Sequence, residues 1–255
     1  MRDKTTNSTP AFGFFRAQVR GLERLSPTFL RVTFGGEALR GFGNPERTLD
    51  QRIKLVFPGV HGLPYLDEGS TFTDWKSLSE GKRGFMRTYS IRDLRVEPGG
   101  GTELAVDFAL HGVGTPIADR NQRAHSKDHN AGPDSKDHSA GPGTQWAQSA
   151  SIGDEILIYG PRRGRFDGGG IEFQPSDSKS IILVGDETAV PAATRILEET
   201  SDSGVRVAAF LEVPTPADAL PVKVGVEQSV EWLPRGQREV GSAVVPAVLA
   251  HLGLE

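Results

Sequence analysis

The hydrophobic pattern of the sequence changes once, near residues 167–179, and this change limits the folds open to the chain. Before it, short segments such as residues 14–25, 28–34 and 103–110 alternate apolar and polar residues between turns rich in Gly and Pro. That pattern predicts an antiparallel barrel. After it, residues 180–184 (SIILV) form a continuous apolar run. Such a run is typical of a strand that is buried on both faces.

The second part of the chain alternates strands with helical segments. Residues 189–200 place apolar side chains on one helical face, residues 205–212 and 229–233 are strand-like, and residues 243–252 end the chain as a helix. This order predicts a parallel α/β layer with a ligand-binding loop after its first strand. That loop, Gly185-Asp186-Glu187-Thr188, is not a dinucleotide fingerprint, because it lacks Gly-x-Gly-x-x-Gly and its carboxylates would repel a pyrophosphate.

Composition excludes several classes of protein. The chain has 255 residues, enough for two modest domains, and no cysteine, so it has no disulfide and no cysteine-bound iron–sulfur cluster. A net charge of −4 without a long basic block argues against nucleic acid as a partner. No apolar run approaches the length of a membrane span, and the N-terminus lacks the apolar segment of a secretory signal. We therefore expect a cytoplasmic protein.

A polar repeat interrupts the barrel pattern. Residues 126–133 (SKDHNAGP) return almost unchanged as residues 135–142 (SKDHSAGP). The repeat has too few apolar residues to form a core, so we expect a disordered surface insertion over residues 119–144. Its histidines, His125, His129 and His138, do not predict a metal site, because nothing fixes their geometry.

The run Arg87-Thr88-Tyr89-Ser90-Ile91-Arg92 combines three groups that suit a flavin nucleotide. The forked guanidinium of Arg87 matches two phosphate oxygens, and the ring of Tyr89 is flat enough to stack on an isoalloxazine while its hydroxyl stays in water. Ser90 is placed to donate a hydrogen bond toward a flavin nitrogen. The alternative is an ordinary sheet strand with solvated arginines, and the run alone does not decide between them.

Four segments, taken together and in order, point to one family. They are residues 87–92 (RTYSIR), 106–112 (VDFALHG), 153–161 (GDEILIYGP) and 183–192 (LVGDETAVPA). These segments resemble the siderophore-interacting proteins, which are flavin-dependent ferric-siderophore reductases related to the ferredoxin–NADP reductase superfamily. The resemblance covers about residues 14–236.

The resemblance implies a fold and an activity. We expect a six-stranded antiparallel flavin-binding barrel in residues 12–168 and a parallel α/β nicotinamide-type domain in residues 178–255. The implied reaction passes electrons from NAD(P)H through FAD to a ferric siderophore and releases Fe(II). A flavin suits this task because nicotinamide gives two electrons as a hydride while Fe(III) accepts one. The alternatives are a flavoprotein reduced by a ferredoxin and a flavin- or siderophore-binding module with little turnover.

The resemblance also implies site residues. Tyr89 and Ser90 are the expected catalytic residues, Lys54 and Arg52 are expected to bind the siderophore, and no metal ligands are expected. The expected cofactor-binding residues are Arg87, Thr88, Tyr89, Ser90, Arg92, His111, Gly114, Thr115, Asp186, Glu187 and Thr188. For Lys54, a solvated strand face remains the alternative.

The chain departs from the family pattern in two places. After the loop that holds the flavin pyrophosphate, the family continues with a small residue and Ser before Trp, whereas here Trp146 follows only after the repeat. Family members also continue past a Trp-Leu-x-Arg-Gly segment, here residues 232–236, into a further strand and a closing helix. The sequence ends at Glu255 without them. We therefore expect the α/β domain to be C-terminally incomplete.

Overall fold

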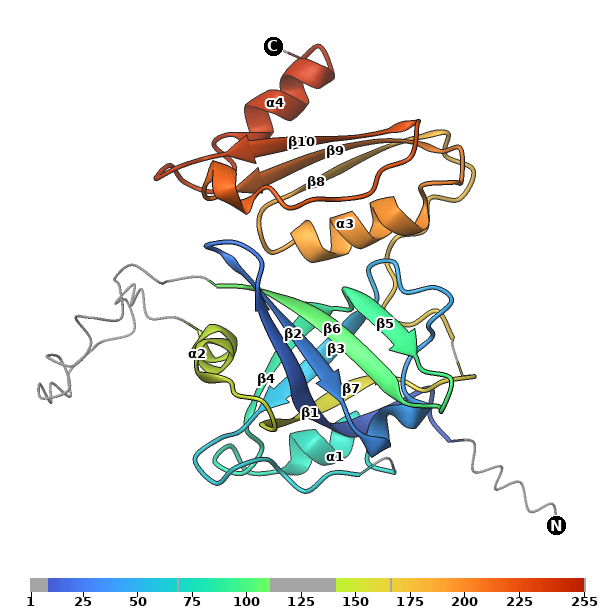
Figure 1. The fold of residues 1–255 in the computed structure, drawn as a ribbon, viewed down its shortest axis with the longest axis vertical. Coiled ribbons are helices and arrows are strands. Elements are labelled where there is room, and N and C mark those ends of the chain that lie inside the picture. The colour runs from blue at the N-terminus through green and yellow to red at the C-terminus, as the bar shows by residue number, and fades with distance from the viewer. Residues whose placement is uncertain (1–8, 68, 111–140, 166, 255) are drawn as a thin grey trace, which may run out of the picture.

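The computed structural model describes residues 9–67, 69–110, 141–165 and 167–254 (Figure 1). Within these residues, seven antiparallel strands form one sheet and three parallel strands form a second. The strands of the larger sheet are β1 (Phe12–Arg24), β2 (Phe29–Gly35), β3 (Arg52–Phe57), β4 (Phe85–Ser90), β5 (Asp93–Val96), β6 (Thr102–Ala109) and β7 (Glu155–Pro161). The predicted antiparallel barrel is confirmed, with seven strands in the described residues instead of six.

The larger sheet is curled because its two edge strands are consecutive in the chain. The spatial order is β4-β3-β7-β1-β2-β6-β5, and only Ile91 and Arg92 connect β4 to β5. The backbone N–H of Arg92 donates to Ala105 on β6, while that of Ile91 donates to Gln51 just before β3. The connection between the edges therefore holds both ends of the sheet together.

The interior of the curled sheet ends in a group of aromatic side chains. Phe57 and Phe108 are fully buried, and Tyr89 packs against both, with ring centroids 6.2 and 4.6 Å away. Trp146 lies 5.1 Å from Phe57 and 5.9 Å from Phe108. Trp146 belongs to helix α2 (Pro142–Ser149), so these contacts fix that helix against the barrel.

Helix α2 corrects the expected extent of the insertion. Most of residues 119–144 lie outside the described residues, as do His125, His129 and His138. Pro142, however, opens α2, and Gly143 and Thr144 are buried in its first turn. The predicted end at residue 144 is therefore wrong. The last proline of the repeat starts the helix, because its fixed φ suits the first helical position.

The three-stranded sheet follows the predicted parallel order. Strands β8 (Ser180–Gly185), β9 (Arg206–Val213) and β10 (Gln228–Pro234) lie in the order β10-β9-β8. Figure 1 shows α3 (Val190–Glu199) between this sheet and the barrel, and α4 (Val244–His251) on the opposite face. The remaining short helices within the described residues are α1 (Phe72–Ser77), η1 (Glu37–Gly41) and η3 (Pro216–Asp218).

Strand β8 is more exposed than its apolar sequence predicts. It was expected to be buried on both faces, but Ile181, Ile182 and Leu183 are only half-buried and Val184 is 51% exposed. The reason is that β8 lies at the edge of the described sheet, beside β9 alone. In the part of the chain that the structure describes, no helix is long and apolar enough to cross a membrane.

Three carboxylates with little exposure connect the loops to the core. Glu212 is fully buried and accepts the backbone N–H groups of Gly241, Ala243 and Val244 ahead of and within α4. Asp218 is also fully buried and accepts hydrogen bonds from Ser26 and Thr28, between β1 and β2. Glu199 on α3 accepts from Thr48 and Leu49. These carboxylates join segments that lie far apart in the sequence.

The same hydrogen bonds determine how the three carboxylates titrate. Burial acts to raise the pKa of Glu199, Glu212 and Asp218, but the hydrogen bonds outweigh burial and hold each pKa below its ordinary value. A group whose pKa is lower in the folded state contributes stability above its unfolded pKa. That contribution is lost as the pH falls through the folded pKa.

We therefore expect the free energy of unfolding to fall steeply as the pH drops from about 5 to about 3, at about 1.4 kcal/mol per unit of pKa difference. Urea unfolding at pH 7, 5 and 4 measures this slope. Asp218→Asn should flatten it, because one depressed carboxyl is removed. As a control, Glu231→Gln changes an exposed residue of β10 and should leave the slope unchanged. A stability that stays constant down to pH 4 would contradict the assignment.

Candidate functional site

A cavity of about 580 Å³ lies where the barrel meets α3. The described residues that line it come from four places: the strands β3, β4 and β6, the segment before β3, the start of α2, and the start of α3. They are Asp50, Arg52, Arg87, Thr88, Tyr89, Ser90, Asp107, Ala109, Gly141, Gly143, Thr144, Thr188, Pro191 and Ala192. The barrel and the segment from Thr188 into α3 therefore contribute to one site.

Strand β4 contributes four successive residues to the cavity, Arg87 to Ser90. Arg87 is exposed, its Nη1 donates to the carbonyl of Met86 at 2.8 Å, and none of the ion pairs among the described residues includes it. Its charge is therefore available to a ligand. The structure brings four residues of the predicted run, Arg87 to Ser90, together at the cavity; their role in binding stays a prediction.

Tyr89 is seated more deeply than its sequence context suggested. Its ring rests on the aromatic core, and its hydroxyl points at Gly143 on α2, where an added Cβ would lie 2.2 Å from the Tyr89 oxygen. Burial raises the pKa of Tyr89 to about 12, against the lowering effect of the Arg87 charge. The hydroxyl was expected in open water; instead it faces a helix that leaves room only for glycine, and it keeps its proton at neutral pH.

The start of α2 carries hydrogen-bond donors toward the cavity. Gly141, the residue before the helix, makes no side-chain cap, so the first N–H groups of α2 have no such acceptor. Thr144 is 7% exposed and lines the cavity, and no hydrogen bond within the described residues engages its hydroxyl. A buried hydroxyl at the positive end of a helix is suited to an anionic group.

A second cavity of about 220 Å³ adjoins the first and contains Lys54. Lys54 faces Thr88 across the β3–β4 pair, and its Nζ lies 3.1 Å from the Thr88 hydroxyl. Arg52 lines both cavities and pairs with Glu172. Phe12 and Tyr159 form an apolar wall. The two predicted siderophore-binding residues therefore lie beside the predicted flavin run.

The loop after β8 brings only one of its three predicted residues to the cavity. Thr188 lines it, and the backbone N–H of Thr188 donates to Asp186 at 2.9 Å. Glu187 is 3% exposed and forms a bidentate ion pair with Arg235, at 2.5 and 2.6 Å. Asp186 and Glu187 are absent from the described lining of the cavity, so for them a cofactor-binding role is a prediction without a supporting contact.

Arg92 is also absent from the described lining of the cavity. Its guanidinium forks onto Glu198 of α3 at 2.8 and 2.7 Å, and its Nε lies 3.6 Å from Asp107. Its predicted contact with the cofactor therefore has no support in these contacts. His111, Gly114 and Thr115 lie outside the described residues.

The contribution of α2 and of the first turn of α3 was not predicted from the sequence. Gly143 and Thr144 stand directly before Gln145 and Trp146. A small residue followed by a hydroxyl residue before Trp is the pattern expected at the pyrophosphate loop, but the repeat displaces it from the strand that normally precedes it. Reading backward from Trp146 would have found both residues. The sequence pattern of α3 did not show which of its faces borders the cavity, so Pro191 and Ala192 were not predicted as lining residues.

Two family models match the chain. The model of the siderophore-interacting FAD-binding domain covers residues 18–165, and that of the siderophore-interacting protein covers residues 178–255. Over 230 residues the chain is 29% identical to ferric vibriobactin reductase ViuB of Vibrio cholerae serotype O1, covering 88% of this chain and 68% of ViuB. It is 30% identical over 237 residues to the NADPH-dependent ferric-chelate reductase of Escherichia coli K12, covering 89% and 74% of the two chains.

Solved structures share the fold. A siderophore utilization protein from T. fusca matches with a TM-score of 0.66 at 24% identity, covering 94% of this chain and 77% of that one. The siderophore-interacting protein SipS from Aeromonas hydrophila matches with a TM-score of 0.63 at 21% identity, covering 96% and 76%. A domain model that spans more than half of the chain decides the assignment: the chain belongs to the siderophore-interacting protein family and carries its FAD-binding domain.

Proposed function

We propose that this chain is an FAD-dependent ferric-siderophore reductase that takes electrons from NAD(P)H and works in the cytoplasm. The observation that carries the proposal is the cavity between the barrel and α3, with the Arg87–Ser90 run on one side and the start of α3 on the other. We further propose two domains, residues 12–168 and 178–255, which contribute these two sides. Relatives named as ferric reductases support the activity.

The residues present fit an FAD pyrophosphate at the start of α2. Thr144 supplies an unengaged hydroxyl, and the first N–H groups of α2 supply donors at the positive end of the helix. Arg87 adds a cation without an acidic partner among the described residues. Of the two carboxylates that line the cavity, Asp107 is neutralised by a bidentate contact from Arg31 at 2.7 and 2.8 Å. An anionic group therefore meets mostly donors there.

In the proposed reaction, the protein's own residues position the flavin and the nicotinamide. FAD, when bound, accepts a hydride and can then give up electrons one at a time. Tyr89 stays neutral and seated on the core, and Ser90 offers a hydroxyl at the same wall. Thr188, in the loop before α3, and Pro191 and Ala192 of α3 border the cavity on the side we assign to nicotinamide.

We assign the second cavity to the ferric siderophore. Its cations, Lys54 and Arg52, suit an anionic chelate, and the rings of Phe12 and Tyr159 suit its apolar or aromatic parts. Reduction weakens the hold of a hard-oxygen chelator on iron, so the protein need not bind the metal itself. Because the cavity shares Arg52 and Thr88 with the first, the two bound molecules would be neighbours.

Anaerobic mixing tests the proposed function. The protein loaded with FAD should lose flavin absorbance within seconds when mixed with NADPH or NADH, and a ferric tris-catecholate should restore it while a ferrous chelator records Fe(II). If a reduced ferredoxin reduces the flavin and neither NADPH nor NADH does, a ferredoxin replaces NAD(P)H as the electron donor. Binding of FAD and ferric chelate without any electron transfer would indicate a binding module.

Gly143→Ala should lower FAD affinity about tenfold or more, because its Cβ would lie 2.2 Å from the Tyr89 oxygen and must displace the ring or the helix. Fluorescence titration of the apoprotein with FAD measures this loss. In a Tyr89→Phe background the same change should cost much less, since the clashing oxygen is gone. An equal loss in both backgrounds would show that Gly143 acts by another route.

Lys54→Ala should leave FAD content unchanged and raise KM for an anionic ferric chelate several-fold, with a weaker salt dependence of kcat/KM, because one term of the attraction is removed. Steady-state kinetics at low and high ionic strength provide the measurement. Lys223→Ala removes the same charge from an exposed position of the second domain and serves as the control. Loss of turnover without a change in KM or salt dependence would refute the assignment.

A further inference from the structure

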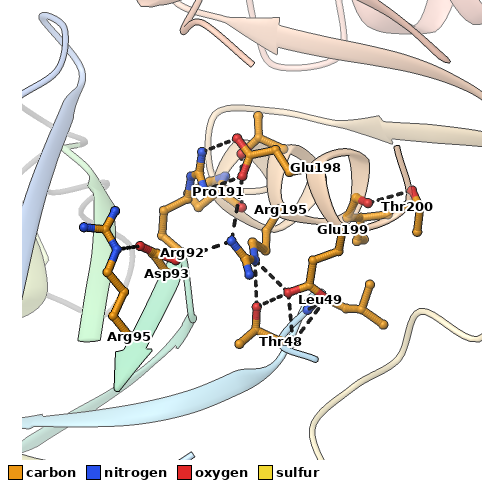
Figure 2. A network of polar contacts seen from close by, with 12 residues as sticks. Thr48, Leu49, Arg92, Asp93, Arg95, Pro191, Arg195, Glu198, Glu199 and Thr200 are labelled. Carbon is orange, nitrogen blue, oxygen red and sulfur yellow. Dashed lines mark hydrogen bonds and ion pairs between the residues drawn. The ribbon is translucent and has the colours of Figure 1, made fainter. Parts of the chain in front are cut away.

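The contact between α3 and the barrel contains a row of crossed ion pairs (Figure 2). From the barrel, Arg92 reaches Glu198 of α3 with both terminal nitrogens, at 2.8 and 2.7 Å. In the opposite sense, Asp93 of the barrel accepts from Arg195 of α3 at 3.4 Å. Neighbouring barrel residues therefore carry opposite charges and meet opposite charges on the helix.

A third contact extends the row toward the end of α3. Glu199 accepts from the backbone N–H groups of Thr48 and Leu49, and Arg195 donates to both Glu199 and the Thr48 hydroxyl, at 2.7 and 2.8 Å. The side chains are largely removed from water: Arg92 is 12% exposed, Arg195 18% and Glu199 14%. At such burial, an unmatched charge is costly.

This pattern selects one register of the helix. Residues 195, 198 and 199 are three and four apart, so they share one face of α3. A slide of α3 by one turn would bring Arg195 opposite Arg92 in a setting with little water. The apolar contacts beside the row, such as that of Ile196 with Leu49 and Ile171, discriminate less strongly between the observed position of α3 and one shifted by a turn. The charges therefore determine the position of α3 along its own axis relative to the barrel.

The register matters because the other end of α3 lines the cavity. Pro191 and Ala192 lie about one turn before Arg195 on the same ten-residue helix, so the position of Arg195 along the barrel also sets theirs. On the barrel side, Arg92 also lies 3.6 Å from Asp107, which lines the same cavity. One arginine thus touches a residue of the cavity wall and the helix that forms the opposite wall.

We propose that Arg92 and Glu198 are positioning residues that fix α3 over the flavin cavity and thereby set the geometry in which the nicotinamide meets the flavin. The inference rests on the proposed function of that cavity. It assigns Arg92 a role through Glu198 in place of a direct contact with the cofactor. The described lining of the siderophore side comes from β1, β3, β4, β7 and Gly170 and includes no residue of α3.

The kinetic test uses Arg92→Gln, Glu198→Gln and the double variant in the full chain. Each single variant should slow flavin reduction by NADPH or NADH about tenfold, and the double variant should be no slower than the singles, because the two residues act as one unit. Reoxidation by a ferric tris-catecholate and FAD content should stay within twofold of wild type. Arg206→Gln removes a 71% exposed arginine of β9 and should change nothing.

Three results would overturn the proposal. Single variants that reduce as fast as Arg206→Gln would show that the pair is dispensable, and multiplicative effects in the double variant would show that the residues act independently. Loss of FAD in Arg92→Gln but not in Glu198→Gln would restore a direct cofactor contact. Where a glutamine variant does not fold, Arg92→Lys, which keeps the charge but loses the fork, and Glu198→Asp give the same comparison.

A second readout is independent of electron transfer. Because the chain has no cysteine, Glu103→Cys on β6 and Glu231→Cys on β10, both exposed, can carry two spin labels at defined sites. The distance distribution between them should broaden or shift in Arg92→Gln and Glu198→Gln and stay narrow in Arg206→Gln. An unchanged distribution would refute the positioning role. If wild type is not reduced by either nicotinamide, the proposed function fails while this measurement still decides the role of the pair.

Discussion

The packing of α3 on two sides at once is the constraint on which the rest of the structure depends. One side of the helix, with Val190, Ala193 and Leu197, closes the three-stranded sheet and also reaches Phe29 of the barrel. Ile196 packs with Leu49 and Ile171 on the barrel side. Such a helix cannot move relative to one sheet without exposing apolar surface on the other, at about 25 cal/mol per Å². Because its first turn also borders the cavity, the same packing gives the site its shape.

Much of the fold was predictable, because local patterns and tertiary packing agree in most of the chain. Alternating residues in β1, β2 and β6 predicted half-buried strands, and the apolar runs of β8 and β9 predicted the parallel layer. The exposure of Val184 was not predictable, since an apolar run does not reveal whether a neighbouring strand lies beside it. The short β5 was missed because four residues carry too little periodicity.

The site was less predictable than the fold, and the reason differs from residue to residue. Arg87 to Ser90 were found because they are adjacent in sequence. Thr144 was missed because the repeat separates it from β6, although Trp146 brings α2 back to the aromatic core. Arg92 and Glu187 were expected at the cofactor, but each faces an opposite charge elsewhere, Glu198 and Arg235. Residue type indicates what a side chain can bind, and only packing indicates which partner reaches it first.

The charges around the two cavities explain how a chain with a net charge of −4 can present a positive site. The carboxylates there are already engaged: Asp107 by Arg31, and Asp50 by the backbone N–H groups of Glu172 and Phe173. Of the cations there, Arg52 pairs with Glu172, whereas Arg87 is engaged by a carbonyl and Lys54 by a hydroxyl, neither of which carries a net charge. The field that a ligand meets is therefore set by Arg87 and Lys54. Since these two side chains border adjoining cavities, the function that we propose would give a cofactor phosphate and an anionic chelate one cation each, so that the two need not compete for one.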